Sequence, residues 1–231
     1  MQDGLSTWQI VASGDPALFA IVRLSLAVSF SAVGLAALVG LPLGALLALT
    51  QFPGRGAVVV LVNALMGLPP VVVGLAVYLM LSRSGPLGDL GILFTPTAMI
   101  IAQAVLIVPI IAGLTRQTIE DLWLEYRDEL SAMDVGSLGR TNTLLWDARF
   151  SLLTALLAGF GRAAAEVGAV MIVGGNIEGF TRTMTTAIAL ETSKGNLPLS
   201  LGLGFVLLLI VFAVNAAAWG ARIWSERHAG R

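Results

Sequence analysis

The sequence contains no cysteine and only one histidine among its 231 residues. The missing cysteines exclude disulfide bonds, thiolate metal sites and thiol nucleophiles. The single histidine, His228, lies in the C-terminal tail, which argues against a histidine-based metal site or general base. We therefore expect a chain that is not an enzyme and that carries no metal and no cofactor.

Charged residues are also scarce. They make up 12% of the chain, whereas soluble domains average about 25%, and hydrophobic residues make up 57%. A net charge of −1 gives no surface for nucleic acid. The sequence also lacks the glycine-rich phosphate-binding motif that ends in Lys-Ser/Thr, so energy from ATP would have to come from a separate chain. This composition indicates an integral membrane protein.

Five apolar segments are each long enough to cross the hydrocarbon core, which takes roughly 20 residues as a helix. We predict an all-α integral membrane protein with about five transmembrane helices, at residues 24–50, 58–81, 96–114, 150–174 and 197–223. Residues 1–22 lack the basic start and cleavage site of a signal peptide, and they mix apolar with polar side chains. We expect this segment to lie at the outer membrane interface, and residues 225–231 to form a cytoplasmic tail.

The predicted loop at residues 116–149 holds 11 of the 27 charged side chains of the chain. If this loop is cytoplasmic, eight basic residues fall on the inside and four on the outside. The positive-inside rule then favours an outer N-terminus and a cytoplasmic C-terminus. A lipid-embedded chain that gathers its charge in one loop offers that loop to a water-soluble partner.

The loop carries apolar side chains at helical spacing, which predicts an amphipathic helix of three to four turns. Gly136 and Gly139 are expected to bracket a turn, and a second short helix is expected to begin at Thr143. Two readings stay open: the apolar face fits a groove on a partner, or it covers the ends of the protein's own helices. The spacing is carried by Leu122, Trp123, Tyr126, Leu130 and Met133.

The same loop resembles the coupling segment of ABC-importer permeases, whose motif is Glu-Ala-Ala, three residues and Gly, followed later by Leu-Pro. Here Ala132 and Gly136 match in register, Ser131 replaces the first alanine, and Glu129 stands one place early. Ala148 and Arg149 stand where the family has Leu-Pro. The resemblance assigns contact with an ATPase to Tyr126, Glu129, Leu130, Ala132, Met133 and Gly136.

Other segments resemble the molybdate and tungstate permeases in particular. They read Phe-Pro-Gly-Arg at residues 52–55, Asn-Ala-Leu-Met-Gly-Leu-Pro-Pro at 63–70, and Ala-Glu-Val-Gly-Ala-Val-Met-Ile-Val-Gly-Gly-Asn-Ile at 165–177. The last of these resembles the tungstate-specific branch most, as do the hydroxyl-rich segment at 181–195 and Ser-Arg-Ser-Gly-Pro-Leu-Gly at 82–88.

The resemblance implies a type-1 ABC importer permease fold over residues 23–224, in the cytoplasmic membrane of a prokaryote. It also implies a homodimer with two ABC ATPase subunits on the cytoplasmic face and an oxyanion-binding protein outside. The expected cargo is tungstate, with molybdate or sulfate as alternatives. An ion-coupled carrier or a channel without an ATPase is the alternative class, although the sequence shows no internal repeat.

Two charged residues interrupt the predicted fourth span. Arg162 and Glu166 lie four residues apart and so share one helix face near the predicted middle of the membrane. An isolated charge there costs at least ~2.5–3.5 kcal/mol, so such residues face a protein interior or a wet cavity. Either the two residues pair and hold helices together, or Arg162 attracts a passing anion.

Three further residues are candidates for the pathway or its gate, namely Asn176, Thr185 and Thr186, because hydroxyl and amide groups bind oxyanions without a fixed charge. The alternative is that the segment around the two threonines is a short interfacial helix that closes the outer face of a dimer. In the second predicted span, Pro69 and Pro70 indicate either a hinge or a static kink.

Overall fold

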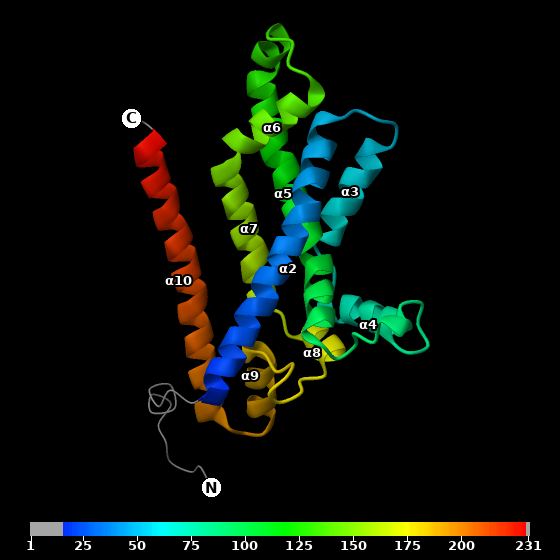
Figure 1. Ribbon diagram of the computed structural model, residues 1–231, viewed down its shortest axis with the longest axis vertical. Helices are drawn as coiled ribbons and strands as arrows, with labels where there is room; N and C mark the ends of the chain where they lie inside the picture. The colour runs from blue at the N-terminus through cyan, green and yellow to red at the C-terminus, as the bar shows by residue number, and fades with distance from the viewer. Residues whose placement is uncertain (1–15, 230–231) are drawn as a thin grey trace. The chain divides into compact units, whose positions relative to one another are not determined.

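The computed structural model describes residues 16–229, and the described chain is all-helical, as predicted (Figure 1). Ten helical elements follow one another along it. They are α2 (Pro16–Leu49), α3 (Arg55–Leu65), α4 (Pro70–Leu81), the short 3₁₀ helix η1 (Gly88–Leu90), α5 (Pro96–Ala132), α6 (Ser137–Asp147), α7 (Arg149–Ala164), α8 (Gly168–Gly174), α9 (Met184–Ser193) and α10 (Leu197–Ala229).

Three of these helices, α2, α5 and α10, are long and apolar enough to cross a membrane by themselves. The number reaches five if the two helix pairs α3–α4 and α6–α7 each form one bent span. The predicted number of about five spans is the upper end of this range, and the chain is a multi-pass membrane protein. Residues 1–15 and 230–231, which belong to the predicted interfacial segment and tail, lie outside the described residues.

The chain divides into two compact units. The first comprises Met1–Ala32, Pro69–Gln103 and Gly161–Arg231, and the second comprises Val33–Leu68 and Ala104–Phe160. In the first unit, α4 packs on α8 and α9 packs on α10. A Cβ atom placed on Gly74 of α4 would lie 2.7 Å from the Cα of Ala169 in α8, so only glycine permits this approach.

In the second unit, the C-terminal half of α2 packs closely on α5. A Cβ atom on Gly44 would lie 2.5 Å from the backbone oxygen of Ala112. The core beside this contact contains Ile119 and Leu144, which are fully buried, together with Leu130. Small residues at such crossings let helices approach where no water is present to drive apolar association.

The helices of the predicted loop differ from the prediction in two places. The predicted third span and the start of the predicted loop form one helix, because α5 continues from Pro96 to Ala132 without a break. No glycine or proline follows Gly113 within this helix, and Arg116 pairs with Glu120 one turn on, which supports the helix. The second helix of the predicted loop begins at Ser137 and contains Gly139, so only Gly136 caps the turn.

The predicted second and fourth spans are interrupted rather than continuous. The second breaks between Leu65 and Pro70, where Pro69 is extended and Pro70 occupies the first position of α4. Proline cannot donate the backbone hydrogen bond that a continuous helix needs, and it disfavours helical geometry in the residue before it. The fourth breaks after Ala164, and α8 begins at Gly168.

Candidate functional site

The break between α7 and α8 places a buried carboxylate at the centre of a polar cluster in the first unit. Arg162, in the last turn of α7, donates from Nη1 to Oε2 of Glu166 at 2.6 Å. The other carboxylate oxygen accepts from the backbone nitrogen of Ala169 at 2.9 Å. The Glu166 side chain is only 2% exposed and that of Arg162 is 29% exposed. Glu166 thus forms an ion pair with the last turn of α7 and accepts a hydrogen bond from the first turn of α8.

Side chains from two other elements donate to backbone oxygens at this break. Gln103 of α5, itself buried, donates from Nε2 to the backbone oxygen of Ala163 at 3.0 Å. Thr185 of α9 donates to the backbone oxygen of Glu166 at 2.8 Å. Unpaired backbone groups are costly in an apolar environment, so these contacts allow a broken helix to be stable at this position.

The second candidate threonine, Thr186, is fully buried and serves the N-terminus of α9. Its hydroxyl accepts from the backbone nitrogen of Thr183, and the Thr183 side chain in turn caps the third residue of the helix. The backbone nitrogen of Met184 donates to the hydroxyl of Ser25 in α2 at 2.8 Å. The start of α9 is therefore fixed both by its own capping box and by α2.

Asn176 follows α8 and lies in the left-handed region at φ 50°, after Gly175 at φ 71°. The predicted end of the helix at these residues is confirmed. The Asn176 Oδ1 atom is buried and has no hydrogen-bond partner. Within residues 16–229, no hydrogen bond joins Asn176 to the cluster around Glu166, so the structure brings Arg162, Glu166 and Thr185 together and leaves Asn176 apart.

In the second unit, the residues predicted to contact an ATPase fall into two sets. Tyr126 and Leu130 pack inward, against the core that contains Ile119 and Leu144. The apolar residues at helical spacing from Leu122 to Leu130 therefore cover the protein's own helices, which is one of the two alternatives that the sequence left open. The other four candidates are exposed at the end of α5 and in the turn before α6, namely Glu129, Ala132, Met133 and Gly136.

The α5–α6 turn, residues 129–137, is held by backbone and arginine contacts. The backbone nitrogen of Val135 donates to the oxygen of Leu130 at 3.2 Å, and Arg140 donates from Nε to the oxygen of Val135 at 2.6 Å. The Arg140 guanidinium also lies over the Trp123 ring, 5.6 Å from its centroid. Met133, in the middle of this turn, is 73% exposed.

Sequence reasoning missed an ion-pair network near the start of α3. The two carboxylate oxygens of Glu120 accept separately from Arg55 and Arg116. Arg55 also donates from Nε to the backbone oxygen of Leu47 at 2.7 Å. The four-residue spacing of Arg116 and Glu120 could have indicated half of this network, but Arg55 is too distant in sequence to be assigned.

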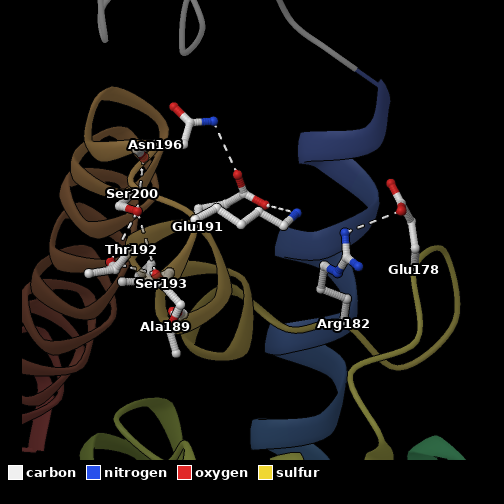
Figure 2. A network of polar contacts seen from close by, with 10 residues as sticks. Glu178, Arg182, Ala189, Glu191, Thr192, Ser193, Asn196 and Ser200 are labelled. Carbon is white, nitrogen blue, oxygen red and sulfur yellow. Dashed lines mark hydrogen bonds and ion pairs between the residues drawn. The ribbon is translucent and has the colours of Figure 1, made fainter.

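A second polar network surrounds the end of α9 (Figure 2). Glu191 accepts from Lys194 at 2.8 Å and from Asn196 at 3.1 Å. The hydrogen bond from Lys194 is the main reason why the pKa of Glu191 lies below its ordinary value; the bond from Asn196 adds to this, and burial opposes it. In the same figure Arg182 and Glu178 form a separate ion pair at 3.4 Å.

Comparison with known proteins identifies the family. No family model matches the chain. The chain is 43% identical to a probable anion ABC transporter permease protein of Haloferax volcanii, over 93% of each chain. It is 41% identical to the tungstate uptake system permease protein TupB of Peptoclostridium acidaminophilum, over 91% of this chain and 92% of the relative.

A more distant relative is the molybdenum transport system permease protein ModB of Azotobacter vinelandii, which is 27% identical over 86% of this chain and 93% of its own length. The two closer similarities each cover nine-tenths of both chains, and the described fold is all-helical with three to five candidate spans. The chain therefore belongs to the family of ABC transporter permease proteins that includes these anion, tungstate and molybdenum permeases.

Proposed function

We propose that this chain is the transmembrane permease subunit of an ATP-driven importer of a tetrahedral oxyanion, with tungstate as the favoured cargo. The observation that carries the proposal is the 41% identity to a tungstate uptake permease over nine-tenths of both chains. Molybdate is the alternative cargo, since a molybdenum permease is 27% identical. Sulfate is a third tetrahedral dianion of the same class.

The proposed assembly is a homodimer of this chain with two separate ABC ATPase subunits and an extracytoplasmic oxyanion-binding protein. The word "uptake" in the name of the tungstate relative supports an importer with these partners. The membrane is the cytoplasmic membrane of a prokaryote. The excess of basic residues in the segments assigned to the inside supports an outer N-terminus and a cytoplasmic C-terminus.

We assign contact with the ATPase to the α5–α6 turn. Glu129, Ala132, Met133 and Gly136 supply its exposed surface, while Tyr126 and Leu130 hold it from beneath by packing on the core. An exposed methionine on a well-supported turn suits an apolar pocket on a partner, because a few such anchors carry most of an interface's energy. Movement of the ATPase would then act directly on α5, which continues into the membrane.

We propose that the translocation pathway runs beside the α7–α8 break. Non-helical backbone at membrane depth is stable only where protein buries it or a wet cavity surrounds it. Arg162, the more exposed partner of the ion pair, would attract the anion, and Glu166 would keep the attraction weak enough for release. Thr185 and Thr186 would position the break, and Asn176 would offer its amide at the end of α8.

Reconstitution into liposomes tests the function. The permease, its ATPase and its binding protein should accumulate tungstate inside vesicles only when ATP is present on the ATPase side. Arg162→Gln should reduce the rate at least tenfold in complexes whose assembly is verified by size-exclusion chromatography, because it leaves Glu166 buried without its counter-ion. Tungstate uptake at the full rate by the permease alone would instead support a carrier or channel without an ATPase.

The choice of cargo is tested on the binding protein, because one ion pair in the permease gives little selectivity. Calorimetric titration of that partner with tungstate, molybdate and sulfate should give the highest affinity for tungstate. A preference for sulfate would refute tungstate as cargo and leave the importer assignment standing.

A further inference from the structure

A cavity of about 350 Å³ in the first unit is lined by two arginines. One face of α2 forms one wall, including Ala20, Arg23 and Leu24, and the loop before α9 forms the other with Glu178 and Arg182. Figure 2 shows Arg182 and Glu178 with their ion pair beside the α2 ribbon. The cavity is separate from the residues of the α7–α8 break, and the proposed transport cycle does not use it.

The described residues neutralise the two arginines only in part. Arg182 is 17% exposed and makes one ion pair, from Nη1 to Oε2 of Glu178 at 3.4 Å, while its Nε is buried without a hydrogen-bond partner. Glu178 is 84% exposed, so water screens its charge. No ion pair of Arg23 with another residue of the described range is present. The described residues that line the cavity thus supply two cations, of which Arg23 is exposed, and one screened carboxylate, while Glu191 acts on Arg182 from outside the cavity.

The loop that presents Arg182 is held firmly. The buried hydroxyl of Thr181 donates to the backbone oxygen of Gly174 at 2.5 Å and accepts from the backbone nitrogen of Ile177 at 2.9 Å. The backbone nitrogens of Thr181 and Arg182 both donate to the oxygen of Ile177. A guanidinium whose backbone is fixed loses less entropy when it binds a ligand, so the arginine is preorganised.

From this geometry we propose that the cavity is a binding site for a tetrahedral oxyanion, held between the guanidinium groups of Arg23 and Arg182. Guanidinium groups match such oxygens in charge and in bidentate geometry, and the free Nε–H of Arg182 supplies an unused donor. The anion has two possible sources: free tungstate, whose relevance rests on the proposed function, or the phosphate of a membrane lipid, whose chains would meet the apolar wall of α2.

The test measures tungstate binding to the full-length permease in nanodiscs of phosphatidylcholine, without ATPase or binding protein, by equilibrium dialysis and elemental analysis. Arg182→Gln should weaken binding about tenfold, since it removes a charge-assisted contact. Arg23→Gln should weaken it several-fold. Glu178→Gln should strengthen binding several-fold because it removes the carboxylate that pairs with Arg182. Arg83→Gln, an exposed arginine outside the cavity, is the matched control and should change nothing.

A second arm repeats the measurement in nanodiscs that contain phosphatidylglycerol, and counts the anionic lipid retained after purification. Competition with tungstate, or retention that Arg182→Gln abolishes, supports the site and identifies lipid phosphate as a source. Glu178→Gln keeps both arginines, so its effect tests the site even if Arg182→Gln does not fold. The proposal is overturned if neither tungstate nor anionic lipid binding responds to Arg182→Gln and Glu178→Gln.

Failure here is distinguishable from failure of the proposed function. ATP-dependent uptake by the reconstituted complex requires the ATPase contact, whereas binding to this cavity requires neither ATP nor a partner chain. Uptake without cavity binding would overturn only the oxyanion site, and cavity binding without uptake would overturn only the importer.

Discussion

The α7–α8 break and the α5–α6 turn each contain a residue that is unusual for its surroundings. At the break it is a buried charge, and at the turn it is an exposed apolar side chain. At the break, Glu166 is almost fully buried, and each of its carboxylate oxygens has a partner inside the same unit. At the turn, Met133 is an apolar side chain that is left 73% exposed. A charge in an apolar interior must be satisfied by the chain itself, whereas an exposed apolar side chain gains most from a partner.

We infer that the break is internal structure and that the turn is a docking surface. The two roles predict different effects of substitution on stability and on association. Substitutions at the break should lower the free energy of unfolding. Substitutions of exposed residues at the turn should leave that free energy unchanged and alter only association with the ATPase. The buried residues beneath the turn, which lie between these two cases, should behave like the break.

The largest expected effect is that of Glu166→Ala, which leaves Arg162 without its counter-ion and Ala169 without its cap. Removing one partner of a buried ion pair costs about 3–5 kcal/mol. We expect that loss in the free energy of unfolding, measured by denaturant titration in detergent. Glu178→Gln, at an 84% exposed carboxylate, is the control and should change stability by less than about 0.5 kcal/mol. Equal effects of the two would refute the assigned role of the buried carboxylate.

Leu130→Ala should have the next largest effect. Leu130 is 8% exposed and packs with Ile119 and Leu144, so truncation leaves a cavity that costs about 2–4 kcal/mol. Met133 lies three residues further on and is 73% exposed. The free energy of unfolding of Met133→Ala should stay within about 0.5 kcal/mol of the wild-type value. Similar losses from both, measured by the same unfolding titration, would contradict the division of the turn into buried support and exposed surface.

Thr185→Val should lower the free energy of unfolding by about 1–2 kcal/mol. The valine matches threonine in shape but removes the hydroxyl that donates to the backbone oxygen of Glu166, and the carbonyl is left without that partner. Ser193→Ala, which removes an exposed hydroxyl that donates to the backbone oxygen of Ala189 within the same helix, is the control on α9. If both variants unfold like wild type, the hydroxyl of Thr185 does not support the break.

The smallest expected effect depends on pH. The pKa of Glu191 is lowered, chiefly by the hydrogen bond from Lys194, so the contact stabilises the fold above the ordinary value of about 4.5. This contribution should disappear as the pH falls from about 4.5 through the lowered pKa of the folded state. Melting temperatures measured between pH 6 and pH 3 should therefore fall less in Glu191→Gln than in wild type. Parallel curves would show that Glu191 contributes no pH-dependent stability.

The sequence was sufficient for the features that depend on local pattern. The apolar runs predicted the membrane helices α2, α5 and α10, and the short helix expected as one reading of the segment around Thr185 and Thr186 is present as α9. The predicted fourth span ends at residue 174, where α8 also ends. Each of these follows from hydropathy over one segment or from the backbone freedom of a few residues.

Features that depend on distant partners could not be predicted. The break at Ala165–Val167 is stabilised by Gln103 and Thr185, which lie far from it in sequence. The apolar ladder from Leu122 to Leu130 had two possible partners, and its amphipathic spacing alone does not distinguish the protein's own core from another chain. The length of α5 was missed because helix propensity continues across a change from apolar to charged residues.

The most direct test of the proposed ATPase contact is the affinity of the purified permease for its ATPase with one aspartate placed on either side of α5. Leu124 of α5 and Met133, which directly follows α5 and still donates to the Glu129 oxygen, are 70% and 73% exposed. They lie nine residues apart, which at 3.6 residues per turn places them on opposite sides of the helix axis. We predict that Met133→Asp weakens the complex at least tenfold and that Leu124→Asp leaves it unchanged, with both variants as stable as wild type. An unchanged affinity in Met133→Asp would contradict the assignment of the α5–α6 turn as the coupling surface.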